Sequence, residues 1–190
     1  MRRHQASATR AYAGLGTDTI NGVLAGTTPV SGAFLLKILA TSITLETGGS
    51  GGIVTPIFFV GATSGAALAP FFGVPTTFLA AVGLVAMLAA AANTPIAAAV
   101  MAMELLPGPE GVYAALAAAT AFLMVGHRSV YASQKLGLAK SAGLDMELGG
   151  AVGDVTRASV RIRKGSLTDR VHRFGRAPSA DKKTEPDDSA

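Results

Sequence analysis

The residues with the clearest potential for chemistry lie at positions 48–56, which read Gly-Gly-Ser-Gly-Gly-Ile-Val-Thr-Pro. Successive small residues let a bare backbone approach a ligand closely. The amides of Ile53 and Val54 fall at the start of a predicted helix, where N–H groups have no acceptor within the helix. Such amides, with the helix dipole, favour an anion without placing a full positive charge beside it. Read alone, the same pattern also fits a device for close helix packing.

The segment around this motif carries no charge, because no Asp, Glu, Lys, Arg or His occurs in residues 47–103. The chain of 190 residues is 49% hydrophobic and 15% charged, with a mean hydropathy of +0.43. A soluble domain carries about 25% charged residues. Abundant Ala, Gly, Ser and Thr indicate helices that pack closely on one another in a membrane. We therefore expect a polytopic membrane protein, with a soluble alanine-rich helical protein as the contrasting alternative.

Short helices must position the motif. Residues 1–30 predict an incomplete helix and a loop, since glycines interrupt any long period. Apolar helices are then expected at residues 31–45, 53–69, 76–92, 96–106 and 112–125, followed by a weaker helical stretch at 129–138. Pro70 and Pro75 bracket the end of the second of these helices. The Asn-Thr-Pro at residues 93–95 predicts a cap and a helix restart.

Most of these predicted helices are shorter than the roughly twenty residues that a perpendicular membrane span needs. Broken backbone at membrane depth is tolerated only where protein or a water-filled cavity covers it. Transporters build their ion sites from such broken helices. The sequence therefore indicates tilted or paired helices around a site and argues against a simple anchor.

The charge of the chain is concentrated towards its C-terminus, where 12 of the 16 Lys and Arg residues follow Gly126. The positive-inside bias predicts that residues 140–190 form a polar, basic cytoplasmic tail, disordered over residues 178–190. Contact with anionic lipid is a further option. Nucleic-acid binding is not expected, because Phe174 is the only aromatic residue near the basic cluster. With no cysteine and three scattered histidines, no metal site and no cofactor are expected.

Three ordered motifs resemble the CLC chloride channel and transporter family. Residues 51–62 resemble the family's Gly-Gly-Ile-Phe-Ala-Pro stretch and its continuation. Residues 89–104 resemble its small-residue helix, its Ala-Pro restart and its helix-ending Glu. The His-Arg-Ser-Val-Tyr at residues 127–131 falls where the family has Pro-Leu-Tyr. Order and compatible spacing across residues 31–139 make this resemblance more specific than a lone motif.

The resemblance implies an all-α polytopic fold with short, tilted and broken helices, in which residues 31–139 form the second inverted repeat. It implies chloride transport in the plasma (inner) membrane, either passive or in exchange for protons, with no enzymatic step. It also implies a homodimer, with dimer-facing helices around residues 95–126. The family's earlier half carries Gly-Ser-Gly-Ile-Pro and Gly-Arg-Glu-Gly-Pro stretches that have no match here. We therefore expect the C-terminal half alone, inactive without the missing N-terminal half.

By the same resemblance, the central anion site comprises Gly52, Ile53, Val54 and Thr55, with the Tyr131 hydroxyl as its side-chain donor. Without the resemblance, Tyr131 would be interpreted as an aromatic residue at the membrane interface. Val54 and Thr55 stand where Phe and Ala are usual, and some fluoride-exporting members also vary here. The ion is therefore left open between chloride, fluoride and nitrate.

Four charged residues lie near the apolar region. Two of them have alternative interpretations, and the other two are expected to have structural roles. Glu46 is either a proton-handling group or a helix-end charge at the interface. Lys37 either snorkels or faces a polar interior. Glu104 is expected to cap or pair structurally, and Glu110 to be a solvated acid at a helix start.

A second function, from another class, keeps the membrane topology without transport. The chain would then be a truncated or regulatory subunit that binds other membrane helices. Its small-residue helix faces fit that function equally well.

Overall fold

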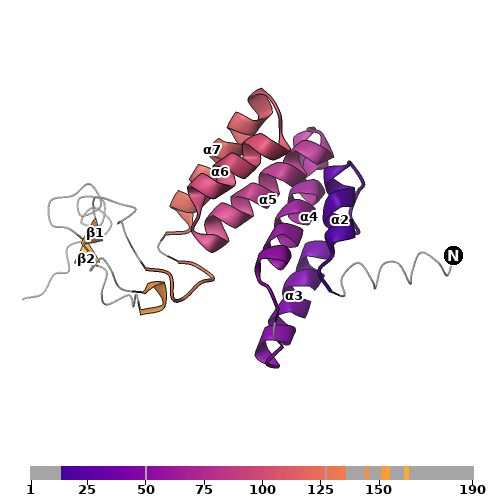
Figure 1. Ribbon diagram of the computed structural model, residues 1–190. Helices are drawn as coiled ribbons and strands as arrows, with labels where there is room; N and C mark the ends of the chain where they lie inside the picture. Colours follow the sequence, from indigo (N-terminus) through magenta and orange to yellow (C-terminus); the bar gives the residue numbers. More distant parts are fainter. Residues whose placement is uncertain are drawn as a thin grey trace, which may run out of the picture. The chain divides into compact units, whose positions relative to one another are not determined.

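The computed structural model describes residues 14–49, 51–126, 128–135, 144–145, 151–154 and 161–162. The chain divides into two compact units, Met1–Ala132 and Ser133–Ala190. The described part of the first unit is helical, which confirms the predicted all-α class. Its helices, shown in Figure 1, are α2 (Thr17–Leu24), α3 (Ala33–Glu46), α4 (Val54–Phe72), α5 (Thr76–Ala92), α6 (Pro95–Leu105) and α7 (Pro109–Met124).

The predicted helix restart between α5 and α6 is confirmed. Asn93 follows α5 with a φ of 59°, a left-handed conformation that stops the helix, and Pro95 is the first residue of α6. Asparagine is one of the few residues that adopt this conformation readily, and proline suits the first helical position. Residues 93–95 therefore set the end of α5 and the start of α6, as the sequence indicates.

Two predicted boundaries differ from the structure. Helix α4 continues through Pro70 to Phe72 and ends at Gly73, whose φ is 64°. A proline in the last turn removes only one helix hydrogen bond, so it does not end the helix here. The helix predicted at residues 129–138 is wrong over its described part, since residues 128–135 have no helical turn. There the Val130 N–H donates to the Ala91 carbonyl at 2.8 Å, outside its own segment.

Helices α4 and α5 form an antiparallel pair that depends on glycine. A Cβ atom added at Gly61 would lie 2.6 Å from the Gly83 carbonyl oxygen, and one at Gly65 would collide with the Leu79 carbonyl oxygen. Real Cβ atoms do not approach backbone so closely, so only glycine permits this separation of the two helices. The Gly61 and Gly65 pair therefore packs against α5.

Alanine allows a similarly close approach among α5, α6 and α7. Ala98 and Ala102 of α6 and Ala114 and Ala118 of α7 are fully buried, and α7 packs on both α5 and α6. Larger buried residues of this core include Phe59 on α4 and Val85 on α5. Alanine side chains lose no rotamer freedom when buried, which suits them to closely spaced helices.

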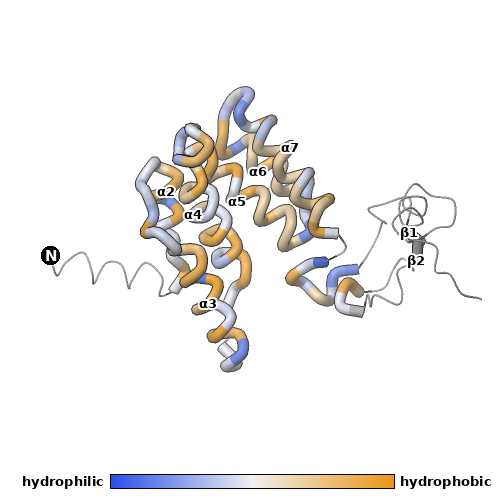
Figure 2. Tube along the Cα trace, turned by 180° about the vertical axis from the view of Figure 1, so that it is seen from behind, coloured by the Kyte–Doolittle hydropathy of each residue, from blue (hydrophilic) through white to orange (hydrophobic). Residues whose placement is uncertain are grey.

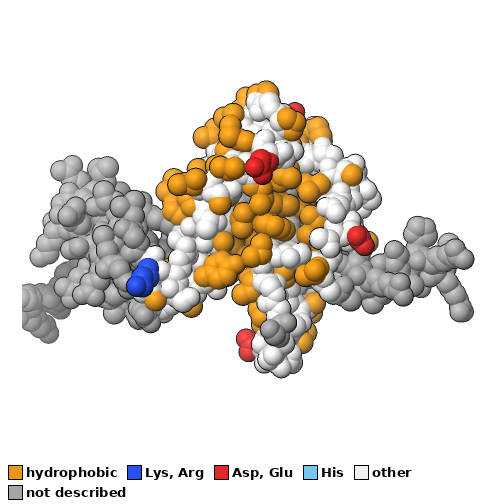
Figure 3. Space-filling model, viewed as in Figure 1, with side chains coloured by type: hydrophobic (Ala, Val, Ile, Leu, Met, Phe, Trp, Pro, Cys, Tyr) orange, Lys and Arg blue, Asp and Glu red, His pale blue; other side chains and the backbone are white. Residues whose placement is uncertain are grey.

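The helices of the first unit carry apolar side chains outward as well as inward. Phe71 is 85% exposed and Met124 is 83% exposed. Orange colouring runs along most of these helices in Figure 2, and hydrophobic side chains occupy the middle of the face in Figure 3. One described helix, Val54–Phe72, is long and apolar enough to cross a membrane, and three shorter helices are also apolar. Large exposed apolar areas are typical of surfaces covered by lipid or by other protein.

The described part of the second unit contains two strands of two residues each, β1 (Leu144–Asp145) and β2 (Arg161–Ile162), and the turn η1 (Val152–Asp154). The strands pair antiparallel, with Leu144 opposite Ile162, and Lys135 bridges to Ala151. The sequence does not predict these short strands. The predicted disorder at residues 178–190 lies outside the described residues.

Candidate functional site

The start of α4 leaves several backbone N–H groups without an acceptor. Ile53 caps the helix, and the first helical hydrogen bond runs from the Ile57 N–H to the Ile53 carbonyl at 3.2 Å. Among the described residues, nothing accepts a hydrogen bond from the N–H groups of Ile53, Val54 or Thr55. The helix start predicted at the glycine-rich motif is therefore confirmed, with unpaired donors in its first turn.

The glycines before this helix are not packed against other described parts of the chain. A Cβ atom added at Gly51 or Gly52 would meet no described heavy atom within 4 Å. This differs from Gly61 and Gly65, whose missing side chains are required by the neighbouring helix. Within this chain, open space beside Gly51 and Gly52 favours close approach of a ligand over the packing alternative.

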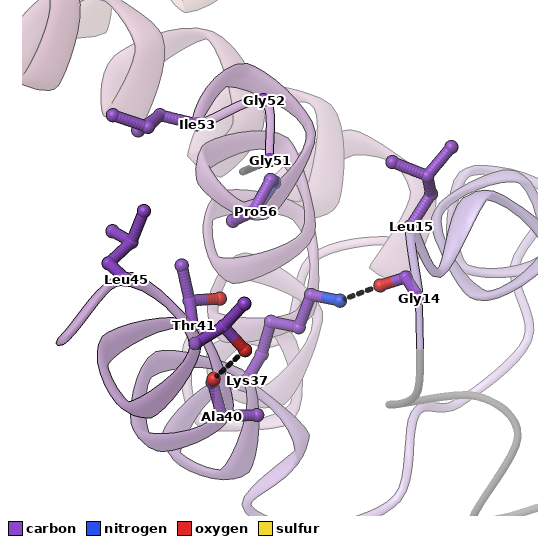
Figure 4. A pocket seen from close by; sticks show the side chains of 11 residues that line it. Gly14, Leu15, Lys37, Ala40, Thr41, Leu45, Gly51, Gly52, Ile53 and Pro56 are labelled. Atoms are coloured by element: carbon purple, nitrogen blue, oxygen red, sulfur yellow. Dashed lines mark hydrogen bonds between the residues drawn. The ribbon is translucent and has the colours of Figure 1, made fainter. Parts of the chain in front are cut away.

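A pocket of about 330 Å³ lies between α3 and the start of α4 (Figure 4). Gly52 and Ile53, two of the predicted site residues, line it. Val54, Thr55 and Tyr131 are not part of its lining. The remaining lining comes from α3, the segment before α2 and the rest of the α4 start: Gly14, Leu15, Lys37, Ala40, Thr41, Thr44, Leu45, Gly51 and Pro56.

Lys37 brings a cationic side chain to this pocket. The residue is only 3% exposed, and most of the other α3 residues are apolar. Its Nζ donates a hydrogen bond to the Gly14 carbonyl, drawn as a dashed line in Figure 4. The same Nζ lies 5.2 Å from the centroid of the Phe59 ring, within the range of a cation–π interaction. Lys37 is therefore buried within the described part of the chain, and its two predicted settings both stay predictions.

Two threonines of α3 share the face of Lys37. Lys37, Thr41 and Thr44 follow the spacing i, i+4 and i+7, which places them along one side of a helix. The Thr44 hydroxyl donates to the Ala40 carbonyl at 2.7 Å, and Thr41 lines the pocket beside it. Sequence reasoning missed these threonines as site residues. The signal in the sequence was their spacing from Lys37, which places all three side chains on one face of the helix.

Tyr131 lies in the irregular segment after α7 and is 40% exposed. The Val130 N–H binds the Ala91 carbonyl at 2.8 Å, and the Ser129 hydroxyl donates to the same carbonyl at 3.4 Å. These bonds hold the segment at the C-terminal end of α5. Because Gly65 packs beside Leu79 and Gly61 beside Gly83, that end of α5 is on the same side of the helix pair as the start of α4.

The acidic residues singled out from the sequence do not line this pocket. Glu46 is the last residue of α3 and is exposed. Glu104 and Glu110 are also exposed, near the end of α6 and in the first turn of α7. The described residues contain no group of three His, Asp or Glu side chains that could hold a metal ion.

Comparison with known proteins identifies the family to which these helices belong. The family model described as voltage-gated chloride channel matches residues 6–126. The "Chloride/fluoride channel protein" of Pseudomonas syringae pv. tomato is 48% identical over 108 residues, which are 56% of this chain and 24% of that relative. The matched segment is thus about a quarter of the relative's length. No solved structure is significantly similar to the chain. Because the family model covers more than half of it, the chain belongs to the voltage-gated chloride channel family.

Proposed function

We propose that this chain forms part of an anion pathway through a membrane, with the ion bound at the start of α4. The donors are the N–H groups of Ile53 and Val54, with Gly52 and Thr55 beside them. The observation that carries this proposal is the unpaired first turn of α4 next to the open backbone of Gly51 and Gly52. Backbone amides at a helix start attract an anion and still release it, since no full positive charge contacts the ion.

The ion is a small halide, chloride or fluoride. The name of the Pseudomonas relative, chloride/fluoride channel protein, supports this class of ion. Val54 and Thr55 stand at the positions where the family usually has Phe and Ala, so these two side chains are the natural candidates for setting ion preference. The ion moves either passively or in exchange for protons, without a covalent step.

Tyr131 supplies the side-chain donor of the same site through its hydroxyl. The hydrogen bonds to Ala91 hold its segment at the end of the helix pair where α4 begins. A phenol at such a position donates one hydrogen bond and carries no charge, which suits an ion in transit.

The chain works together with the N-terminal half of a complete transporter and does not conduct alone. Its match covers 24% of the Pseudomonas relative, and the gating motifs of the earlier half have no counterpart in it. The full protein is a homodimer in the inner membrane, with residues 95–126 facing the partner and the C-terminal tail in the cytoplasm. The exposed apolar side chains of α6 and α7 support a lipid- or protein-covered setting.

The alternative is a truncated or regulatory membrane subunit that binds other helices without transporting. Exposed apolar faces fit this function as well. The two functions differ in whether anions cross a membrane that contains the assembled protein.

The test uses what we call the assembled channel, which is the full chain co-expressed with the part of the Pseudomonas relative that precedes its matching segment. Halide-selective electrodes record chloride and fluoride efflux from liposomes that contain the co-purified complex. We expect efflux from the assembled channel and none from liposomes that contain the chain alone. The intact relative is the positive control. A co-purified complex without efflux favours the regulatory subunit, and efflux from the chain alone refutes the requirement for a second half.

A further inference from the structure

The carbonyl of Ala91, near the end of α5, is left free by the residue four positions further along the chain. In a continuous helix, the N–H group of residue 95 would donate to this carbonyl. Residue 95 is a proline, the first residue of α6, and proline has no N–H group. The helix restart therefore leaves a hydrogen-bond acceptor at the end of α5 for residues outside these two helices.

Two consecutive residues of the segment after α7 use this acceptor. The Val130 N–H donates to the Ala91 carbonyl at 2.8 Å, and the Ser129 hydroxyl donates to it at 3.4 Å. A carbonyl oxygen has two lone pairs, so it accepts both hydrogen bonds at once. The first bond has an ordinary length and the second is long, which makes the backbone bond the main attachment of the segment. Attachment through Val130 alone leaves the orientation of the next residue open.

The Ser129 side chain extends this attachment to Tyr131. The Tyr131 N–H donates to the Ser129 Oγ atom at 3.2 Å, within the ordinary range for N–H donors. A serine oxygen that accepts from the N–H two residues further on closes a local turn and restrains the backbone between them. One hydroxyl group thus contacts both the end of α5 and the backbone of Tyr131.

We propose that Ser129 is a positioning residue for Tyr131. Its hydroxyl holds the α5 carbonyl and the Tyr131 N–H at the same time, and so fixes the backbone from which the phenol projects. The Tyr131 side chain is 40% exposed, so the described part of the chain covers it only partly and restrains it mainly through its backbone. This inference rests on the proposed function, because it assigns Ser129 to the side-chain donor of the proposed anion site.

The competing explanation is that Ser129 only completes a turn and that the Val130 bond holds the segment by itself. Loss of the hydroxyl would then change stability at most, and would alter neither the surroundings of the Tyr131 ring nor the halide dependence of efflux. Ser129→Thr and Ser129→Val are a matched pair, since the two side chains have nearly the same shape and only threonine has a hydroxyl. The difference between them therefore separates the hydrogen bonds from the effect of added volume.

The first experiment records the fluorine NMR resonance of a fluorinated tyrosine placed at position 131 of the assembled channel in detergent. The chemical shift depends on the surroundings of the ring and requires no transport. We expect Ser129→Ala and Ser129→Val to shift or broaden this resonance, and Ser129→Thr to keep it near its wild-type position. A wild-type resonance in both the alanine and the valine variant overturns the proposal.

A measurement on the unsubstituted assembled channel decides the matter if the alanine and valine variants do not fold. The Tyr131 N–H is expected to exchange slowly with solvent deuterium, because it donates to the Ser129 Oγ atom. A Tyr131 N–H that exchanges as fast as one in an unstructured peptide overturns the proposal.

The second experiment measures efflux from liposomes that contain the assembled channel as the chloride or fluoride concentration is varied. We expect Ser129→Ala to raise the halide concentration that gives half-maximal efflux by about threefold or more, and Ser129→Thr to restore it. In the Tyr131→Phe background, Ser129→Ala should have no further effect, because the donor that Ser129 positions is already absent. An equal effect of Ser129→Ala in both backgrounds overturns the proposal.

The two experiments together distinguish this inference from the proposed function. If the fluorine resonance responds to Ser129→Val but Tyr131→Phe leaves efflux unchanged, Tyr131 is not the ion donor, and the positioning by Ser129 stands. If Tyr131→Phe reduces efflux but the resonance does not respond to loss of the Ser129 hydroxyl, the positioning fails and the proposed function stands.

Discussion

The amide nitrogen of Val130 lies 2.8 Å from the carbonyl oxygen of Ala91 and donates a hydrogen bond to it. Ala91 is the penultimate residue of α5, so no N–H group of that helix is available to donate to its carbonyl. The bond therefore satisfies a helix end and fixes the segment that carries Tyr131. A single backbone contact thus connects the end of α5 with the proposed side-chain donor.

Val130→Pro should reduce halide efflux, because proline has no N–H to donate to Ala91. Tyr131→Phe removes only the proposed donor hydroxyl. We expect Val130→Pro to reduce efflux from the assembled channel at least as much as Tyr131→Phe does, with a stability loss of about 1 kcal/mol. Val130→Ala keeps the N–H and is the matched control. Equal efflux from the proline and alanine variants would show that the bond does not position Tyr131.

Gly61→Ala should separate α4 from α5. The added Cβ atom would lie 2.6 Å from the Gly83 carbonyl oxygen and 2.8 Å from the Met87 Cβ atom. Overpacking of this kind costs about 1–3 kcal/mol, which thermal unfolding in detergent measures. Gly22→Ala in α2 is the control, since its nearest contact would be an ordinary 3.6 Å. Equal unfolding midpoints for the two variants would contradict the close packing of the helix pair.

Asn93→Gly should be tolerated, whereas Asn93→Val should destabilise the protein by about 1–2 kcal/mol. The φ of 59° at this position suits glycine and strains a β-branched residue. The buried Oδ1 atom of Asn93 has no hydrogen-bond partner among the described residues, so its removal should cost little. Equal destabilisation of the glycine and valine variants in thermal unfolding would contradict this prediction, because it would show that the Asn93 side-chain amide makes a stabilising contact.

Leu116→Glu should dissociate the proposed homodimer. Leu116 is 60% exposed on α7, within the residues proposed to face the partner. A carboxylate buried against an apolar partner should weaken association by about tenfold or more. Phe72→Glu, at the exposed end of α4, is the control outside that region. Light scattering of the assembled channel in detergent measures its mass, and an unchanged mass for Leu116→Glu would place the dimer contact elsewhere.

The helix ends were the most predictable part of the fold, because they depend on local chemistry. Asn93 and Pro95 set the junction between α5 and α6 through their own backbone preferences, and a reader of the sequence sees both residues. Pro70 misled the prediction since its effect depends on how much helix follows it, and here only two helical residues do.

Contacts between distant residues were the part that could not be predicted. The bond between Lys37 and Gly14 joins residues 23 positions apart, and that between Ser129 and Ala91 spans 38. The first joins two residues of the pocket wall, and the second lies in the described part of the segment where a helix was expected. The residue types of the two acceptors, Gly14 and Ala91, give no sign of these bonds, because every residue has a backbone carbonyl. The start of α4 was predictable, but the cation beside it was not.

The most direct test of the proposed anion site removes one amide hydrogen at the start of α4. Ile53 has a φ of −81°, which proline can adopt, and it follows the permissive Gly52. No described residue accepts a hydrogen bond from the Ile53 N–H, so Ile53→Pro should leave the fold intact, and Ile53→Ala, which keeps the N–H, controls for the lost side chain. We predict that chloride and fluoride efflux from the assembled channel falls by about tenfold or more in Ile53→Pro, the loss expected for a hydrogen bond to a charged group, and stays near wild type in Ile53→Ala. Equal efflux from both variants would contradict the claim that these backbone amides bind the ion.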